Sequence, residues 1–158
     1  MNHFDLLQGW VSSLGRIIGV NLEFDENCVC TMLYGEDICL SLVPCEGNEA
    51  TFIVAGQVIA LTMDPDVDDL IFKAVLKINF LGAETGCGVL GLGLYDGMIV
   101  FAHAINYSEC DEILLQNVVQ NVANDIERIR GQILNHLRNE AKSQSKVLDT
   151  VNSLPMYG

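Results

Sequence analysis

The feature that most constrains this chain is the pair Asp96-Gly97, which stands between two apolar runs within residues 88–105. Asp and Gly tolerate positive φ, and a two-residue type I′ turn requires positive φ at both central positions. We therefore predict a β-hairpin in which Tyr95 faces Met98. In this register one face of the hairpin is bulky and the other is nearly bare.

The bare face carries alternating glycines, Gly91 and Gly93. Glycine in a strand costs entropy and packs nothing, so we expect a helix or a second backbone to approach closely there. The pattern is superficially similar to a nucleotide-binding loop. Such a loop opens a helix, whereas these glycines lie inside a strand, and no Gly-Lys-Ser/Thr follows them. We interpret the run as a close-packed strand.

The charge balance limits the class of partner. The 158 residues include 21 acidic and 8 basic ones, which gives a net charge of −13. Nucleic acid and anionic membrane surfaces bind basic patches, so a charged partner should be basic. The N-terminus lacks the features of a signal peptide, and no segment is apolar for long enough to span a bilayer. We expect a cytoplasmic protein without membrane insertion, whose cysteines stay reduced.

Apolar periodicity predicts an α+β fold in the order α-β-β-β-α-β-β-α. Residues 4–18 form an amphipathic helix that ends near Gly19. Short turns then separate strand-like segments, and tight loops can join only antiparallel strands, so we expect a meander. The strand-like segments lie at residues 20–25, 28–34, 37–43 and 50–60.

Two further helices follow from capping signals. Asp64 is a good N-cap and Pro65 suits the first helical position, so a helix should cover 64–81. Ser108 opens a sequence that resembles a capping box and starts a helix of about 28 residues. We expect a single domain over residues 1–141 and a flexible tail over residues 142–158.

The cysteines are the first candidates for chemistry. Cys28 and Cys30 share a strand face, and Cys39 lies near Met32 if a two-residue Gly35-Glu36 turn sets the register. The spacing fits neither a zinc knuckle nor a thioredoxin-like centre. Cysteine packs as a small hydrophobe, which favours a structural role. A small thiol- or metal-dependent enzyme that uses these three cysteines stays open as an alternative.

Other polar residues suggest no active site. The three histidines are scattered, and the acidic cluster at 64–69 lacks the ligand order of a calcium loop. We therefore predict no catalytic residue, no cofactor and no metal. A small ligand-sensing or scaffold domain is the second alternative.

Three stretches carry a family resemblance: residues 22–30 with a Phe-Asp-Glu-Asn turn, Leu70 to Asn79, and Gly88 to Ile105. With the first and last helices they span residues 4–138, and their order resembles that of the class I type III secretion chaperones, the Tir-chaperone-like family. The resemblance implies a homodimeric, ATP-independent, non-enzymatic chaperone in the bacterial cytoplasm. Its clients would be secreted effectors, bound through an extended N-terminal segment, and the secretion ATPase is a candidate further partner.

The resemblance also implies a client site and a dimer interface. The client groove would lie on the first helix and the meander, rimmed by acidic residues such as Asp5, Glu23 and Glu36. Periodicity cannot distinguish a groove from an ordinary core face, so both interpretations stay open for the helix residues. The expected client-binding residues are Phe4, Leu7, Val11, Leu14, Leu40 and Leu42. The expected interface residues are Leu70, Ile71, Val75, Ile78, Leu90, Gly91, Leu92 and Gly93, from the 64–81 helix and the 88–95 strand.

Overall fold

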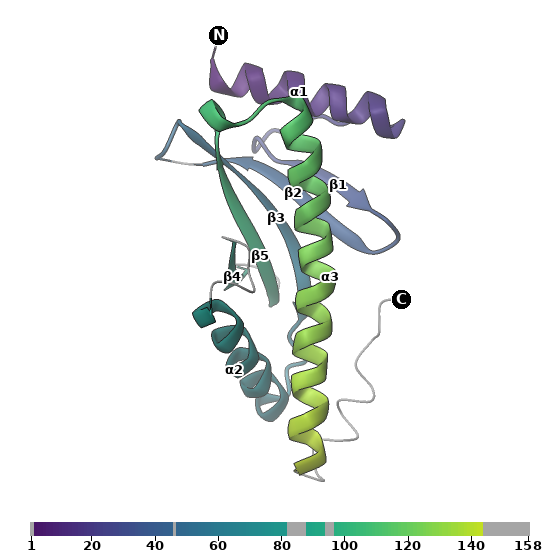
Figure 1. Cartoon of the computed structure of the whole chain (residues 1–158), viewed down its shortest axis with the longest axis vertical. Coiled ribbons are helices and arrows are strands. Elements are labelled where there is room, and N and C mark those ends of the chain that lie inside the picture. The colour runs from purple at the N-terminus through teal and green to yellow at the C-terminus, as the bar shows by residue number, and fades with distance from the viewer. Residues whose placement is uncertain (1, 46, 82–87, 94–96, 144–158) are drawn as a thin grey trace. The chain divides into compact units, whose positions relative to one another are not determined.

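A computed structural model describes residues 2–45, 47–81, 88–93 and 97–143, and it confirms the predicted α+β class and element order (Figure 1). A short 3₁₀ turn, η1, precedes the last helix. The elements are α1 (His3–Ile18), β1 (Cys30–Tyr34), β2 (Ile38–Pro44), β3 (Thr51–Ala60), α2 (Pro65–Leu81), β4 (Val89–Leu92), β5 (Met98–Asn106), η1 (Tyr107–Glu109) and α3 (Glu112–Ser143).

The chain divides into two compact units. Unit 1 comprises Met1–Gly56 and Ala102–Asn124, and unit 2 comprises Gln57–Phe101 and Asp125–Gly158. A single domain over 1–141 stays a prediction. Of the predicted flexible tail, residues 142 and 143 belong to α3 and residues 144–158 lie outside the described residues.

The five strands form one sheet in the order β1-β2-β3-β5-β4. β1 pairs with β2 and β2 with β3 in antiparallel register, as the predicted meander requires. Beyond the ends of β3 and β5, the Tyr107 amide donates to the Ala50 carbonyl in unit 1, and the Leu61 amide donates to the Gly97 carbonyl in unit 2. These two bonds make the β3–β5 pairing antiparallel as well. β1 and β4 are the edges of the sheet.

The predicted first helix is confirmed, and its caps explain its bounds. The Asn2 side chain accepts the Phe4 amide, and Asp5 accepts the Asn2 amide, which completes a capping box. Gly19 ends the helix at φ 77°, in the left-handed region that favours glycine. The helix therefore begins and ends on signals within a few residues of its own termini.

The predicted strand at 20–25 does not form. Residues 21–24 are extended but belong to no sheet, and the chain then turns at Asp25, whose carboxylate accepts the amides of Asn27 and Val29. The pattern is that of a strand, but no described residue supplies a partner strand. We call residues 21–24 the linker segment.

The predicted two-residue turn at Gly35-Glu36 is also wrong. Tyr34 pairs with Ile38, so the loop contains three residues, and Cys39 lies opposite Leu33 instead of near Met32. Gly35 has the positive φ, 65°, that the first position of the predicted type II′ turn requires, but the loop is one residue longer. The glycine alone does not fix the length of the loop.

The second hairpin differs from its prediction by two positions. The Gly93 amide donates to the Met98 carbonyl at 2.7 Å, which in a regular antiparallel ladder places Gly93 opposite Met98, whereas the prediction paired it with Val100. Gly97 has the positive φ that the predicted turn requires, at 60°. Residues 94–96, including Tyr95 and Asp96, lie outside the described residues.

Both later helices begin on aspartate. Asp64 caps α2 as predicted, accepting the Asp66 amide at 3.0 Å. For α3 the predicted N-cap Ser108 is wrong: it lies in η1, and Asp111 accepts the Leu114 amide at 2.7 Å. Among the described residues, no helix is long and apolar enough to cross a membrane.

Each unit has its own core. In unit 1 the register puts the even-numbered residues of β1, β2 and β3 on one buried face, and the rings of Trp10 in α1 and Phe52 in β3 lie 6.4 Å apart. In unit 2 the buried residues come from the end of β3 and from α2, β4, β5 and α3. The largest of them are Ile71, Ile99, Phe101, Ile126, Ile129 and Ile133.

Candidate functional site

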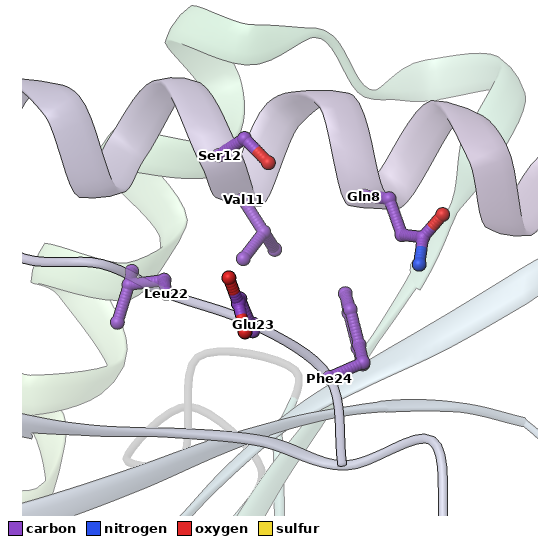
Figure 2. Close-up of a pocket in the computed structure, with 6 residues that line it drawn as sticks. All are labelled: Gln8, Val11, Ser12, Leu22, Glu23 and Phe24. Atoms are coloured by element: carbon purple, nitrogen blue, oxygen red, sulfur yellow. The ribbon is translucent and has the colours of Figure 1, made fainter. Parts of the chain in front are cut away.

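A pocket of about 400 Å³ lies in unit 1 between α1 and the linker segment. Figure 2 shows side chains from both elements around the same space, with Val11 projecting from the helix toward Glu23 and Phe24. The lining mixes apolar and polar groups, so it can hold an apolar side chain beside a charged one. The lining residues are Gln8, Val11, Ser12, Leu22, Glu23 and Phe24.

The backbone of the linker segment is held only at its ends. The Val20 amide donates to the Gly15 carbonyl, and the Asp25 amide donates to the Val29 carbonyl. Between these points, no described residue forms a backbone hydrogen bond with Leu22 or Phe24. An extended chain with free amides and carbonyls is what an edge strand offers to a pairing segment. The linker segment therefore leaves backbone groups without a described backbone partner next to the pocket.

The approach of the linker segment to α1 depends on Gly15. A Cβ built at Gly15 would lie 2.7 Å from the Val20 carbonyl oxygen and 3.2 Å from the Leu22 amide nitrogen. Real Cβ atoms do not approach a backbone oxygen so closely, so only glycine fits without a shift of the chain. Gly9, in the same helix, has open space around it. Gly15 thus sets the spacing of the two pocket walls.

Contacts within unit 1 also orient the pocket residues. The rings of Phe4 and Phe24 meet edge to face with centroids 5.0 Å apart. Glu23 is exposed, and its carboxylate accepts the side-chain amide of Asn21 at 2.7 Å. The predicted rim residues Asp5 and Glu36 are exposed as well. The pocket therefore has a lining ring, Phe24, that packs on Phe4, and it carries an accessible negative charge at Glu23.

Most of the predicted client-binding residues are buried. Leu7, Leu14, Leu40 and Leu42 are at most 5% exposed, and Phe4 is half-buried. Val11 is buried too, but it lines the pocket. Their contact with a client stays a prediction. The sequence reasoning missed Gln8 and Ser12, because a search for apolar periodicity cannot select polar lining residues.

The predicted interface residues of unit 2 fall into two groups. The exposed or half-buried group lies on or just after β4: Leu92 is 55% exposed, Gly91 is exposed, and Gly93, which follows β4, is half-buried. A Cβ at Gly91 would meet nothing within 4 Å, so the expected close approach is not made by a described residue of this chain. The buried group is Leu70, Ile71, Val75, Ile78 and Leu90.

A second apolar stripe on α2 was missed. Phe72, Leu76 and Phe80 are 36%, 67% and 88% exposed, and on β4 Val89 and Leu92 are 61% and 55% exposed. We call Phe72, Leu76, Phe80 and Leu92 the α2–β4 apolar surface; Val89 is three positions from Leu92, so its side chain points to the other face of β4. The signal was present in the sequence, because residues spaced by four lie on one helix face. The search for apolar periodicity selected the longer stripe of α2, which fills the core, and passed over this shorter one.

Asn79 joins the two elements of this surface. Its side-chain amide donates to the Leu90 carbonyl at 2.9 Å, and its side-chain oxygen accepts the Leu90 amide at 2.9 Å. The pair reproduces the two bonds that a neighbouring strand would make. Asn79 therefore closes the β4 edge at Leu90.

Cys30 and Cys39 do not lie together at one site. Because Cys30 pairs with Leu42 and Cys39 with Leu33, the two thiols lie on opposite faces of the sheet. Burial raises the pKa of the Cys30 thiol, and the charge of Asp25 raises it further. Burial also raises the pKa of Cys110 to about 11. Within the described part of the chain, no group of three His, Cys, Asp or Glu side chains could hold a metal.

Solved structures with a similar fold include secretion chaperones in complex with other proteins. The ExsC–ExsE complex aligns with a TM-score of 0.69 at 14% identity, covering 82% of this chain and 95% of that one. The HopA1–SchA chaperone–effector complex aligns at 0.59 and 18% identity, covering 82% and 94%. The Yersinia pestis type III secretion chaperone SycH, in complex with a fragment of YscM2, aligns at 0.54 and 15% identity, covering 77% and 98%.

A comparison with curated proteins finds no match to the sequence. The sequence profile of the Tir chaperone protein (CesT) family matches residues 10–130, which include the linker segment, the sheet, α2 and most of α3. With this match and the shared fold, the chain belongs to the Tir chaperone protein (CesT) family.

Proposed function

We propose that this protein is a non-enzymatic, ATP-independent chaperone of the bacterial cytoplasm that binds the N-terminal segment of a secreted effector. The observation that carries the proposal is the pocket beside the unpaired linker segment. Family membership gives the class of protein, and the solved relatives include a chaperone–effector complex. The client would stay extended and soluble until secretion.

The geometry accounts for binding without catalysis. A client strand can pair with the free amides and carbonyls of the linker segment. Side chains alternate along a strand, so every second client side chain faces the pocket wall formed by Val11 and Phe24. This arrangement would select a segment that is extended and carries apolar side chains at every second position. A segment that has not folded can adopt this form.

We further propose that the chaperone is a homodimer formed through the α2–β4 apolar surface. Large exposed apolar patches on soluble proteins mark interaction sites. A second copy of the chain offers the same patch, so a two-fold axis would cover both at once. This surface lies in unit 2, whereas the client pocket lies in unit 1. The proposed interface and the client pocket therefore share no residue.

The test is recovery and reconstitution of a client. A tagged chain is purified from a bacterium that carries it and a type III secretion system, and co-purifying proteins are identified. The N-terminal segment of a recovered secreted protein is then mixed with the purified chaperone. We expect a stable complex in which limited proteolysis leaves that segment intact.

Gln8→Trp supplies the specific control, because an indole at this exposed position would fill the pocket. The variant should keep its stability and lose at least about tenfold in affinity for the segment. Failure of every recovered N-terminal segment to bind would contradict the proposal. Unchanged affinity of the Gln8→Trp variant would place the client elsewhere.

A further inference from the structure

Charge is distributed unequally between the two units. Residues 1–56 and 102–124, which form unit 1, contain eleven of the 21 acidic residues and one of the eight basic residues, Arg16. Unit 2 contains the other ten acidic and seven basic residues. The formal net charge is therefore −10 for unit 1 and −3 for unit 2. The unit that holds the pocket carries most of the charge of the protein.

The internal ion pairs follow the same division. Among the described residues, the two ion pairs that the structure records are Lys73 with Asp69 and Arg128 with Asp125, and both lie in unit 2. The pocket carboxylate Glu23 instead accepts a neutral amide from Asn21. A neutral donor leaves the negative charge of the carboxylate in place. A cation that approached the pocket would meet an accessible anion.

Two more carboxylates near the pocket are satisfied by backbone amides. Asp5 accepts the Asn2 amide in the α1 cap, and Asp25 accepts the amides of Asn27 and Val29 in the turn after the linker segment. These bonds fix the positions of the carboxylates. Both lie toward the Phe24 end of the linker segment, because Phe24 packs on Phe4, the neighbour of Asp5, and Asp25 follows Phe24. That end of the linker segment therefore carries fixed negative charges in addition to Glu23.

We infer that the segment bound along the linker segment is basic, with apolar side chains that alternate with Lys or Arg. The inference rests on the proposed function and names the chemistry of its client. In an extended chain, one face would place apolar side chains against Val11, Leu22 and Phe24, while neighbouring cations pair with Glu23. The field of a unit with a charge of −10 would also speed the encounter and reject acidic segments.

Two 12-residue peptides test the inference. Both alternate Val and Leu with a charged residue, which is Lys in one peptide and Glu in the other. Binding to the full chain is measured by fluorescence anisotropy at 50 mM and 300 mM NaCl. We expect the Lys peptide to bind at least about tenfold more tightly than the Glu peptide, and to lose at least about threefold in affinity at the higher salt concentration.

Two variants with the same change in net charge locate the effect. Glu23→Lys should weaken binding of the Lys peptide about fivefold, and Glu127→Lys, at an exposed position of unit 2, less than about twofold. Equal losses in the two variants would overturn the inference, as would equal affinity of the two peptides or binding of neither. The proposed function would survive these outcomes if a recovered effector segment still bound and Gln8→Trp still abolished its binding.

Discussion

The side chain of Asn79 pairs with both backbone groups of Leu90, donating to its carbonyl and accepting from its amide at 2.9 Å each. β4 is an edge of the sheet, and an unpaired edge invites further strands. Asn79 blocks pairing at this point and holds the edge strand against α2. The linker segment in unit 1 differs, because no described residue makes such a pair of bonds with the backbone of Leu22 or Phe24.

Asn79→Asp should therefore destabilise the protein. The carboxylate can accept the Leu90 amide but cannot donate to its carbonyl, and we expect a loss of about 1–3 kcal/mol in the free energy of unfolding at pH 7. Below the pKa of a carboxyl group the protonated side chain regains its donor, so the difference from the wild type should shrink at about pH 4. Urea unfolding at both pH values measures this.

Asn139→Asp is the matched control, because Asn139 is exposed on α3 of the same unit. Hydrogen exchange of the Leu90 amide adds a local readout, which should accelerate in Asn79→Asp alone. Equal destabilisation by both substitutions, or unchanged exchange at Leu90, would refute the role of Asn79.

The two glycines of α1 should respond in opposite directions. Gly15→Ala would drive a methyl group into the Val20 carbonyl, so the variant should lose stability and displace the linker segment. Gly9→Ala has open space and should gain up to about 1 kcal/mol from helix propensity. Thermal unfolding measures both. A stabilised Gly15→Ala variant would show that the pocket walls are not fixed by this contact.

The α2–β4 apolar surface should govern assembly. Leu76→Asp and Phe80→Asp place a charge on exposed apolar positions, so each should convert the dimer to a folded monomer. Ile113→Asp is the control, since Ile113 is 70% exposed on α3 in unit 1. Sedimentation velocity gives the mass. Dimers of unchanged stability in both α2 variants would exclude this interface.

Leu7→Ala distinguishes a filled core position from a groove position. Leu7 is fully buried, so the truncation should cost about 2–5 kcal/mol of stability. The affinity of the folded fraction for a client should change little. Loss of affinity without loss of stability would instead restore Leu7 to the client groove that the sequence predicted.

The thiols should differ in reactivity. Cys28 is exposed, whereas burial raises the pKa values of Cys30 and Cys110, to about 11 for Cys110. A raised pKa keeps a thiol protonated, and the thiolate is the reactive form. Iodoacetamide at pH 8 should therefore modify Cys28 first, as measured by peptide mass spectrometry. Rapid modification of native Cys30 would contradict this and would reopen the thiol-enzyme alternative.

Local signals were enough to predict most of the helices. The predicted Gly19 end of α1 and Asp64 start of α2 each depend on residues within one turn, and so does the capping box of Asn2 and Asp5, which was not predicted from the sequence. The start of α3 shows where local signals stop being enough. Ser108 and Asp111 are both good N-caps, and the sequence alone does not say that a 3₁₀ turn comes between them.

The strand registers and the exposure of apolar side chains could not be predicted locally, because they depend on the rest of the fold. Gly35 suits loops of two and of three residues, and the choice decides whether Cys39 shares a face with Cys30. The linker segment has the pattern of a strand but no partner in the described chain. Burial of Leu7 and exposure of Phe80 likewise depend on which of several apolar faces meets the core. None of these is visible in a period of apolar residues.

The most direct test of the proposed function is hydrogen exchange of the chaperone with and without an effector segment. The amides of alternate residues in an extended chain point to the same side, so an added strand should protect one of two sets on binding, either Leu22 with Phe24 or Asn21 with Glu23. Amides in α2 and β4 should change little. Protection confined to α2 and β4, with unchanged exchange in the linker segment, would contradict the account.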